Sequence, residues 1–301
     1  MNEGDRFKSV PALIVAGEVV QLSPLVRRIT APNPSALTGP GTNTYILGKK
    51  KLTVLDPGPV DQLHIDAILE ATNNKIDMIV VTHTHDDHSP AAKILADKTG
   101  ALLIGALYPD DGYQDLTFRA DKKIRHGEIL ATDEFTLEAI HTPGHVGNHF
   151  CYLLKDNQLD EKEGMLFTGD HIMEGSTVVI IPPSGDMADY IHSLQLLKQY
   201  PIQSMAPGHG HLIQQPMDYV NYLINHRLKR EQKVIDALRQ CGETSLNNLT
   251  KAVYDDVDVS LHLIASISLW AHLLKLEKEG KARRAKVAEA AFGEDCWKIL
   301  P

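Results

Sequence analysis

The stretch Thr82-His83-Thr84-His85-Asp86-Asp87-His88 decides how this 301-residue chain is organised. The apolar residues 76–81 before it predict a buried strand, and Ser89-Pro90 after it predicts the start of a helix. The histidines therefore lie where a strand ends and a loop begins. His83 and His85 are two positions apart, so in extended chain they point to the same side. Imidazole and carboxylate side chains together favour zinc or another first-row divalent metal.

A His-x-His pair alone is weak support for a metal site, but the chain supplies further ligands of the same kind. Each of them directly follows a predicted strand, and loops at strand ends of a rigid scaffold are where chemistry usually lies. These later residues are His145, Asp170 and His209. Because so many histidines and acids exceed what acid–base chemistry requires, the set predicts a site for two metal ions.

Three motifs carry a resemblance to a known family. Asp56 in the sequence LDPG, the HTHDDH motif at 83–88 and the three later ligands, in this order, resemble the metallo-β-lactamase superfamily. The implied ligands of one metal are His83, His85 and His145. The implied ligands of the other metal are Asp87, His88 and His209. By the same resemblance, Asp170 bridges the two ions.

Two departures from neighbouring families narrow the expected metal. Zinc β-lactamases usually carry cysteine where this chain has Asp170, and flavo-di-iron proteins usually carry glutamate where it has His85. A di-zinc hydrolase therefore fits better than either, and we expect two divalent ions, Zn²⁺ first, with Mn²⁺ or Fe²⁺ as alternatives.

Other polar residues near the ligands are candidates for supporting roles. We expect Asp56 to fix a ligand histidine rather than to touch a metal. Asn43 belongs to Gly41-Thr42-Asn43-Thr44, which resembles a stretch beside the active site in one subgroup of the superfamily but fits plain turn chemistry equally well. His149 and His171 are expected to support the ligands or to hydrogen-bond substrate.

The pattern of elements predicts an α/β fold. Strands are expected at 12–21, 26–30, 43–47, 52–55, 76–81, 101–105, 135–140, 149–154, 165–168 and 202–206, and helices at 60–72, 89–99 and 186–199. Two β-rich halves that face each other, with helices outside, make the αβ/βα four-layer sandwich of the superfamily. The polar insert at 106–123 fits either a lid over the metals or inert surface.

A smaller unit is expected at the C-terminus. An amphipathic helix at 217–240 precedes helices at 244–254 and 260–279 and a basic turn at 280–284, an order that resembles a winged helix. The sequences GPGTNTYILG, GDHIMEGST and LHLIASISLWAHLLKLEKEGKARR resemble the β-lactamase-like protein 2 family, some members of which are endoribonucleases acting on single-stranded RNA. The expected divisions are a catalytic domain at 1–215, a linking helix at 216–242 and a winged-helix-like domain at 243–301.

Composition bounds the setting of the protein. Apolar content of 43% and charged content of 23% are ordinary for a soluble protein. Cys151, Cys241 and Cys296 lie far apart, the N-terminus has no apolar stretch, and no apolar run approaches the roughly 18 residues that span a membrane. We therefore expect a reduced, cytoplasmic protein that does not enter membranes.

Charge separates the possible partners. The net charge is −9, but residues 227–286 carry +4, which leaves −13 on the remainder and disfavours broad capture of nucleic acid by the catalytic part. A basic cluster in the C-terminal unit favours RNA instead. It consists of Lys278, Lys281, Arg283, Arg284 and Lys286. The same unit fits a homodimer contact, or a cover for the sandwich, equally well.

The function implied by the resemblance is hydrolysis. A hydroxide that bridges two metals would attack an ester, thioester, lactone or phosphoester bond of a small molecule, and Asp87 or Asp170 would pass its proton to the leaving group. The alternative is an endoribonuclease that acts on single-stranded RNA.

Overall fold

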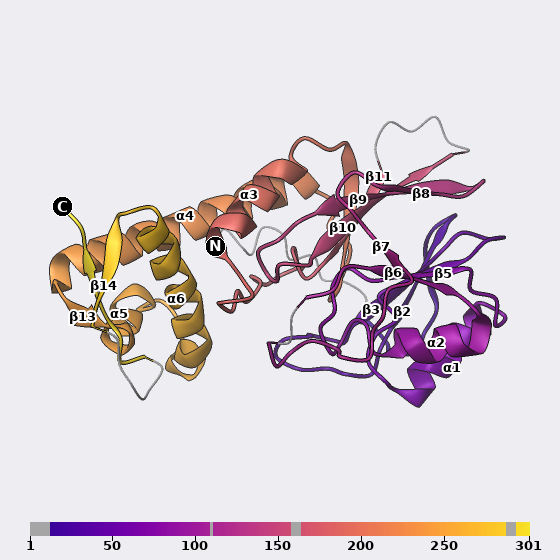
Figure 1. Ribbon diagram of the computed structural model, residues 1–301, viewed down its shortest axis with the longest axis horizontal. Helices are drawn as coiled ribbons and strands as arrows, with labels where there is room; N and C mark the ends of the chain where they lie inside the picture. The colour runs from indigo at the N-terminus through magenta and orange to yellow at the C-terminus, as the bar shows by residue number, and fades with distance from the viewer. Residues whose placement is uncertain (1–12, 109–110, 158–163, 287–292) are drawn as a thin grey trace.

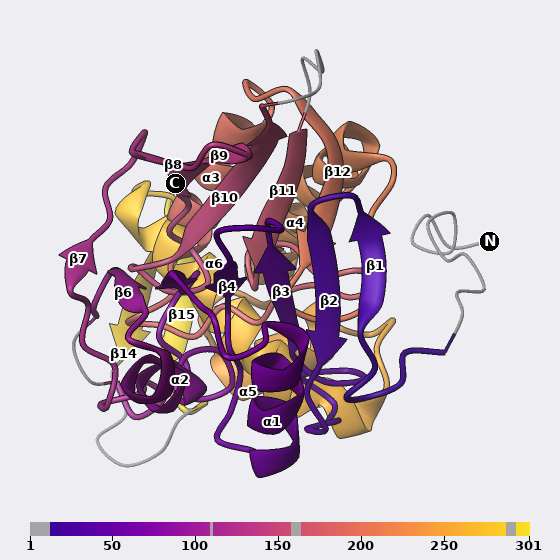
Figure 2. The same cartoon turned by 90° about the vertical axis from the view of Figure 1, so that its right-hand side faces the viewer.

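The computed structural model describes residues 13–108, 111–157, 164–286 and 293–301. Within these residues, two β-sheets face each other with helices on their outer faces, and a smaller unit lies beyond the end of a long helix (Figures 1 and 2). Ala12, residues 109–110 of the polar insert and the side chain of Lys286 figure in the expectations above and lie outside the described part.

The first sheet runs in the order β1-β2-β3-β4-β5-β6-β7. Its strands are β1 (Val20–Ser23), β2 (Val26–Thr30), β3 (Asn43–Leu47), β4 (Thr53–Leu55), β5 (Met78–Val80), β6 (Leu102–Gly105) and β7 (Lys122–Lys123). Pairing is antiparallel from β1 to β4 and parallel from β4 to β7. The helices α1 (Gln62–Ala71) and α2 (Ala91–Thr99) pack on one face through Ile65, Ile68 and Leu95.

The second sheet runs in the order β12-β11-β10-β9-β8. Its strands are β8 (Ile129–Ala131), β9 (Phe135–His141), β10 (Phe150–Asp156), β11 (Gly164–Gly169) and β12 (Ile202–Pro207). Two helices, α3 (Met187–Leu197) and α4 (Pro216–Cys241), cover its outer face. Asp186 caps α3, because its side chain accepts hydrogen bonds from the backbone N–H groups of Ala188 and Asp189.

Aromatic side chains fill the space between the two sheets. Tyr45, Phe135 and Phe167 are fully buried there, and the ring centroids of Tyr45 and Phe167 lie 4.9 Å apart. Each buried side chain of this size contributes about 1.5–3 kcal/mol to folding. The expected four-layer αβ/βα sandwich is confirmed.

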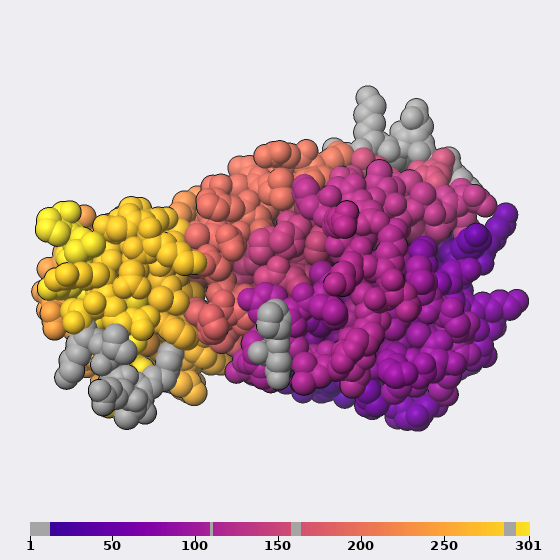
Figure 3. Space-filling model, in the orientation of Figure 1, coloured from indigo at the N-terminus to yellow at the C-terminus, as the bar shows by residue number. Residues whose placement is uncertain are grey.

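The C-terminal unit is a winged-helix domain. It contains α5 (Leu246–Val253), the 3₁₀ turn Val259–Leu261, α6 (His262–Lys278) and a sheet in the order β13-β15-β14. The strands are β13 (Thr244–Ser245), β14 (Ala282–Lys286) and β15 (Cys296–Ile299). This domain forms a separate lobe at one end of the molecule (Figure 3).

Two expectations of secondary structure are wrong. The basic turn at 280–284 is largely strand, because β14 pairs with β15 and Arg284 stacks on the buried Trp297. Most of the strand expected at 12–21 is absent from the described residues of that range, where pairing begins only at Val20. Gly17 makes a turn at φ +78°, and Val15 and Val19 are exposed, so their apolar side chains face no core.

The expectation that no segment is apolar enough to span a membrane also needs correction. Residues Val259–Lys278 pass that test by length and composition, with mean hydropathy 1.4. In the structure this segment is the 3₁₀ turn and α6, and 44% of the apolar window is buried. Leu269, Leu273 and Leu276 pack into the core of the C-terminal unit, so helix packing accounts for the apolar residues in the second half of the segment, whereas Val259 and Leu263 at its start are exposed.

Candidate metal centre

The HTHDDH motif lies at the carboxyl end of β5, and Asp56, which follows the neighbouring parallel strand β4, fixes where it starts. Asp56 accepts hydrogen bonds from the backbone N–H and the hydroxyl of Thr82, both at 2.7 Å. Its backbone is left-handed, at φ +49°, a conformation that aspartate tolerates better than most residues. The same carboxylate lies 3.1 Å from Nδ1 of His88, so Asp56 orients that ring from behind.

The structure brings His83, His85 and His145 together. Nδ1 of His85 lies 2.9 Å from Nε2 of His83 and 3.0 Å from Nε2 of His145. Burial lowers the pKa of His83 well below its usual value and that of His85 to about 3, so both rings are neutral at neutral pH. A metal ligand must be a neutral imidazole, and these rings already are.

The tautomers of two of these rings follow from their partners. Nδ1 of His145 lies 2.8 Å from the carbonyl oxygen of Val179, and a carbonyl can only accept, so Nδ1 carries the proton. Nδ1 of His83 lies 3.0 Å from the hydroxyl of Thr82, which already donates to Asp56, so this nitrogen is also the donor. In both rings the lone pair is left on Nε2, which faces the other histidines.

The second group joins acids to histidines. Oδ1 of Asp170 lies 3.2 Å from Nε2 of both His88 and His209, and Oδ2 of Asp87 lies 3.3 Å from His209. Burial opposes charge on both rings, but Asp170 and Asp87 outweigh it, raising the pKa of His209 to about 9 and that of His88 well above its usual value. Burial alone would raise the pKa of Asp87, but His88 and His209 lower it to about 2.

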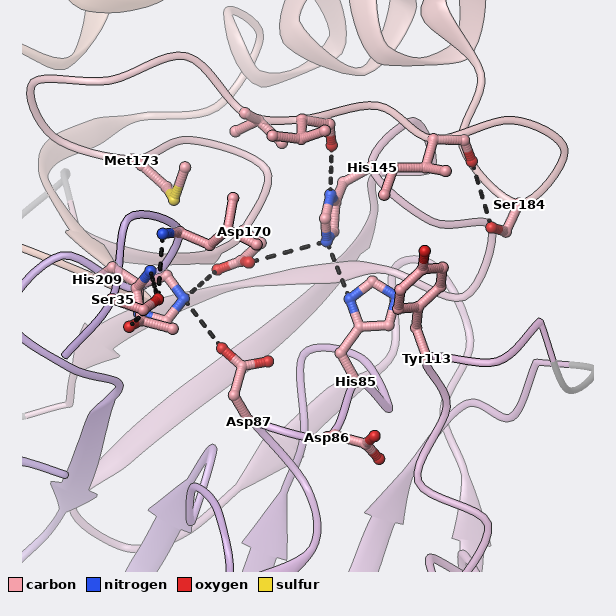
Figure 4. Close-up of a pocket in the computed structure, with 15 residues that line it drawn as sticks. Ser35, His85, Asp86, Asp87, Tyr113, His145, Asp170, Met173, Ser184 and His209 are labelled. Carbon is pink, nitrogen blue, oxygen red and sulfur yellow. Dashed lines mark hydrogen bonds and ion pairs between the residues drawn. The ribbon is translucent and has the colours of Figure 1, made fainter. Parts of the chain in front are cut away.

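Asp170 faces both groups. Its Oδ1 points to His88 and His209, while its Oδ2 lies 3.8 Å from Nε2 of His145. Figure 4 shows Asp170 between His209 and His145. The preceding Gly169 has φ +46°, and a Cβ there would lie 2.6 Å from the hydroxyl of Thr82 and 2.7 Å from Nε2 of His149. Only glycine therefore lets the end of β11 approach the HTHDDH loop this closely.

His149 and His171 are fully buried beside the ligands and do not line the cavity described below. Nε2 of His149 accepts a hydrogen bond from the backbone N–H of Asp170 at 3.2 Å, and its Nδ1 lies 2.9 Å from the hydroxyl of Thr142. His171 packs its ring 4.8 Å from that of Tyr190, and neither of its nitrogens has a hydrogen-bond partner among the described residues. The geometry gives His149 a supporting contact and gives His171 none.

Each residue of Gly41-Thr42-Asn43-Thr44 contacts part of the site. The carbonyl of Gly41 lies 3.2 Å from Nδ1 of His209, and the hydroxyl of Thr42 donates to Asp87 at 3.4 Å. The Asn43 amide donates to the carbonyls on either side of His209, those of Pro207 at 3.0 Å and Gly210 at 2.9 Å. The Thr44 hydroxyl donates to the carbonyl of Asp56 at 2.7 Å. The stretch therefore lies beside the site, as in the subgroup that it resembles.

Some residues of the site were not singled out from the sequence. Thr42 and Thr82 each hold a ligand or its support, and the buried His64 lies 2.8 Å from the hydroxyl of Thr44. Thr82 and Thr42 stand within stretches recognised from the sequence, next to His83 and Asn43, and that adjacency is the signal for their roles. His64 lies inside a helical pattern, and nothing in its sequence context marks it.

Above the ligands lies a cavity of about 340 Å³ (Figure 4). Its walls are largely apolar and are formed by Leu37, Met173, Val178, Val179 and Ile181. Tyr113, from the polar insert, also lines it, with its ring centroid 6.5 Å from that of His85. The insert is held there by backbone pairing with the ligand loop, for example from Asp115 N–H to the carbonyl of Thr84 at 2.6 Å.

The arrangement fits a pair of metal ions. The ligand atoms fall into two groups, each with all its atoms within 4.8 Å of one another. The first is His83, His85 and His145, and the second is Asp87, His88, Asp170 and His209. Nε2 of His88 and Oδ1 of Asp170 are buried and, although they lie 3.2 Å apart as an ion pair, neither makes a hydrogen bond of normal geometry among the described residues, as expected of atoms arranged to bind a cation. Imidazole and carboxylate donors suit divalent first-row metals.

Comparison with known proteins defines the class. The model of the metallo-beta-lactamase superfamily matches residues 37–209, and that of the beta-lactamase associated winged helix domain matches residues 245–289. The chain belongs to the metallo-β-lactamase superfamily and carries a C-terminal winged-helix domain. Because members include relatives named as thioesterases, the chain is a hydrolase of this superfamily.

Within the superfamily, the chain is similar to the β-lactamase-like protein 2 family. The Beta-lactamase-like protein 2 homolog of Drosophila melanogaster is 33% identical over 297 residues, which cover 93% of this chain and 97% of that one. An atrochrysone carboxyl ACP thioesterase of Aspergillus chevalieri is 33% identical, covering 86% and 81%. A beta-lactamase domain protein from Burkholderia ambifaria has the same fold, with TM-score 0.77 at 18% identity over 100% and 99% of the two chains.

Proposed function

We propose that this hydrolase uses two zinc ions to cleave an ester or thioester bond of a small acyl substrate. One ion would be held by His83, His85 and His145, and the other by Asp87, His88 and His209, with Asp170 facing both. The observation that carries this proposal is the convergence of these side chains from loops of both sheets, with all of them except the fully buried His83 and His88 lining one cavity.

The chemistry divides between the ions and the chain. Bound divalent ions would lower the pKa of a water molecule towards neutrality and polarise the oxygen of the substrate. Asp87 lines the cavity and is ionised at neutral pH, since its pKa is about 2. As an ionised carboxylate beside both groups of ligands, Asp87 would be the proton carrier of the proposed mechanism, taking up the proton of the attacking water and passing it to the leaving group. Asp170, which is ionised too, is the other candidate for this role.

The walls of the cavity support an acyl substrate. Leu37, Met173 and Ile181 offer apolar contact next to the ligands, where an acyl group would lie. Among the described residues that line the cavity there is no lysine or arginine, whereas Asp86 adds to the acidic groups. A polyanion would gain little at such walls. The similarity to a relative named as an acyl carrier protein thioesterase supports a thioester in particular.

Cleavage of single-stranded RNA is the second candidate, and the exposed Arg283 on β14 is the observation that favours it. The other cations of the basic cluster whose side chains the structure describes support RNA binding less than the sequence alone suggests, because each has an acidic partner. Lys278 pairs with Asp186, Lys281 with Glu279 at 2.7 Å and Arg284 with Asp295 at 3.6 Å. Cations that already have acidic partners offer less to phosphate. The apolar cavity therefore supports an acyl substrate more strongly than the basic strand β14 supports RNA.

A hydrolysis panel with parallel metal analysis tests the proposal. Purified protein is assayed for metal content and against an acyl thioester, a p-nitrophenyl ester, a lactone and a single-stranded RNA oligonucleotide. We expect two zinc ions per chain and turnover of the thioester or ester, with loss of both in His85→Ala, which excludes a contaminating enzyme. Turnover of RNA alone would replace the acyl substrate with the second candidate. A wild-type protein that cannot be loaded with metal would refute the whole proposal.

A further inference from the structure

One wall of the cavity is a loop without regular secondary structure, residues 174–186, which joins β11 to α3 (the 174–186 loop). Val178, Val179, Ile181 and Ser184 of this loop line the cavity. Its Val179 carbonyl accepts the hydrogen bond from Nδ1 of His145 at 2.8 Å, and Figure 4 shows His145 between that loop and Asp170. The loop therefore determines which way the lone pair of His145 points.

The position of this loop is set by α4. Nη2 of Arg227 donates to the carbonyl of Val178, the residue next to the one that holds His145. Nearer the start of α4, the Tyr219 hydroxyl accepts from the backbone N–H of Gly175 at 3.0 Å and donates to the carbonyl of Met173 at 2.8 Å. One helix thus fixes the loop at its start and next to the residue that contacts a metal ligand.

Arg227 is placed for this contact at some cost. It is only 3% exposed, its Nε has no hydrogen-bond partner among the described residues, and its guanidinium lies 5.2 Å from the ring centroid of Tyr190. Burying a cation is unfavourable unless its contacts compensate. A charged donor makes a stronger hydrogen bond than a neutral one, and here it acts on the backbone beside Val179.

The C-terminal unit in turn holds α4. Val234 and Leu238 of this helix lie in the core of that unit, and Glu231 pairs with Lys275 of α6 at 2.8 Å. A second contact reaches the far end of the 174–186 loop, because Lys278 of α6 pairs with Asp186, whose backbone N–H donates to the carbonyl of Gly144 at 2.8 Å. Gly144 directly precedes His145, so the far end of the wall is tied to α6 of the C-terminal unit, while its start is tied to α4.

We propose that Arg227 is a positioning residue for the metal centre: through the 174–186 loop it aims His145, and α4 makes the C-terminal unit the support of that wall. This inference rests on the proposed function, because it requires that His145 holds a metal. Its consequence is specific. Loss of Arg227 weakens the metal held by the three histidines and spares the metal held by Asp87, His88 and His209.

The chain offers a matched control on the same helix. Arg230, one turn further along α4, donates to the carbonyl of Val253 at 2.6 Å and lies 4.3 Å from the ring centroid of Tyr254. It therefore makes the same kinds of contact as Arg227, with a carbonyl and a tyrosine ring, and adds an ion pair with Asp256 at 2.8 Å, all inside the C-terminal unit. A general loss of packing around α4 would affect both arginine variants alike, whereas positioning of His145 involves Arg227 alone.

The experiment measures zinc affinity by competition with a chromophoric chelator, on metal-free full-length protein. Wild type, Arg227→Gln, Arg227→Lys, Arg230→Gln and Tyr219→Phe are compared, and His145→Ala identifies the binding phase that belongs to the three-histidine site. We expect Arg227→Gln to weaken that phase by about 10- to 100-fold, the usual effect of removing a group that orients a metal ligand. Arg227→Lys keeps a cation and should recover part of the affinity, while Arg230→Gln leaves both phases at their wild-type values.

Tyr219→Phe guards against a variant that fails to fold, because it removes only the hydroxyl that holds the start of the loop. It should weaken the same phase, by less than Arg227→Gln. Wild-type affinity in both Arg227→Gln and Tyr219→Phe, or an equal loss in Arg230→Gln, would overturn the inference while leaving the proposed function intact. Wild-type protein that binds no zinc would overturn the proposed function first, and this inference with it.

Discussion

The metal centre and the C-terminal unit both bury acidic side chains, but they balance the charge differently. At the centre, Asp87 and Asp170 lie against His88 and His209, whose pKa values are raised because these acids outweigh the effect of burial. Protons on imidazole can leave, so a divalent ion can take their place. An acid whose counter-charge can be exchanged is ready to bind a cation.

In the C-terminal unit the counter-charge is permanent. Glu231 lies 2.8 Å from Nζ of Lys275 and 3.5 Å from Nδ1 of His272, and Lys275 also pairs with Glu279 at 2.7 Å. The amine cannot depart, and no cavity opens onto the group among the described pockets. Buried acidic side chains therefore form a candidate metal site in one place and a structural ion pair in the other. The difference is the partner, which is an imidazole at the candidate site and the amine of Lys275 in the C-terminal unit.

Replacement of Asp170 by Asn is the strongest way to break this comparison. The variant keeps the shape of the side chain but removes the charge that faces both metal groups. We expect kcat/KM to fall by about 10³-fold, the scale seen when a preorganised charge is removed, together with loss of bound metal. Steady-state kinetics and elemental analysis measure both. Full activity at wild-type metal content would contradict the role of Asp170.

Replacement of Glu231 by Gln sharpens the other side of the comparison. Lys275 would stay buried without its partner on α4, so the free energy of unfolding should fall by about 3 kcal/mol, near the lower end for a broken buried pair because Glu279 remains. Denaturant unfolding measures this. Asp236→Asn is the control, since its ion pair with Arg239 is exposed and worth no more than about 1 kcal/mol. Equal losses in the two variants would contradict a special role for Glu231.

The pH dependence of the Glu231 effect has a definite sign. Burial opposes ionisation of this carboxyl, but the neighbouring His272 and Lys275, the latter through a hydrogen bond, outweigh burial and lower its pKa below the ordinary 4.5. Its stabilisation is therefore fully present above that value and is lost as the pH falls through the lowered pKa. The gap in unfolding free energy between wild type and Glu231→Gln should therefore stay constant above pH 4.5 and shrink as the pH falls below that value. A gap that stays constant there too would exclude this linkage, and metal-free protein keeps the metal centre out of the comparison.

The smallest expected effect concerns a support of the metal centre. Thr42→Val removes the hydroxyl that donates to Asp87 across 3.4 Å, a long hydrogen bond. We expect kcat/KM to fall by about fivefold, which corresponds to about 1 kcal/mol. Thr38→Val is the control, because Thr38 lines the cavity but donates to the carbonyl of Asn33 and to none of the proposed ligands. A loss in Thr42→Val no greater than in Thr38→Val would remove Thr42 from the site.

Much of the candidate metal centre could be predicted because each of its residues is of a metal-binding type and follows a predicted strand. HTHDDH follows a run of apolar β-formers, and His145, Asp170 and His209 each follow a recognisable strand. Short-range patterns also placed β2 and β3 at the bounds that the structure has, Val26–Thr30 and Asn43–Leu47. The alternation of apolar and polar residues and the turn residues that bound a strand are both visible in a short window of sequence, so such strands can be predicted without knowledge of the rest of the chain.

What could not be predicted depends on contacts between distant parts of the chain. Arg227 and Val178 are 49 positions apart, and the periodicity of α4 alone marks Arg227 as one more polar residue. The strand β15 was missed because its pairing partner β14 was read as a turn, and only the burial of Trp297 between helix and sheet shows that the segment is structural. The walls of the cavity likewise come from loops that no motif links.

The helix α4 belongs to two hydrophobic cores at once. Val220 and Leu223 pack against the second sheet, whereas Val234 and Leu238 pack in the winged helix. If one lobe unfolds, the other therefore loses the apolar contacts that α4 makes with it. We expect calorimetry to show a single cooperative transition in which the measured enthalpy of unfolding equals the van't Hoff value. A truncation that removes the C-terminal lobe would expose the apolar side chains of Val234 and Leu238 on α4. The end of that helix would then fray, and the remaining catalytic part would not be an intact domain.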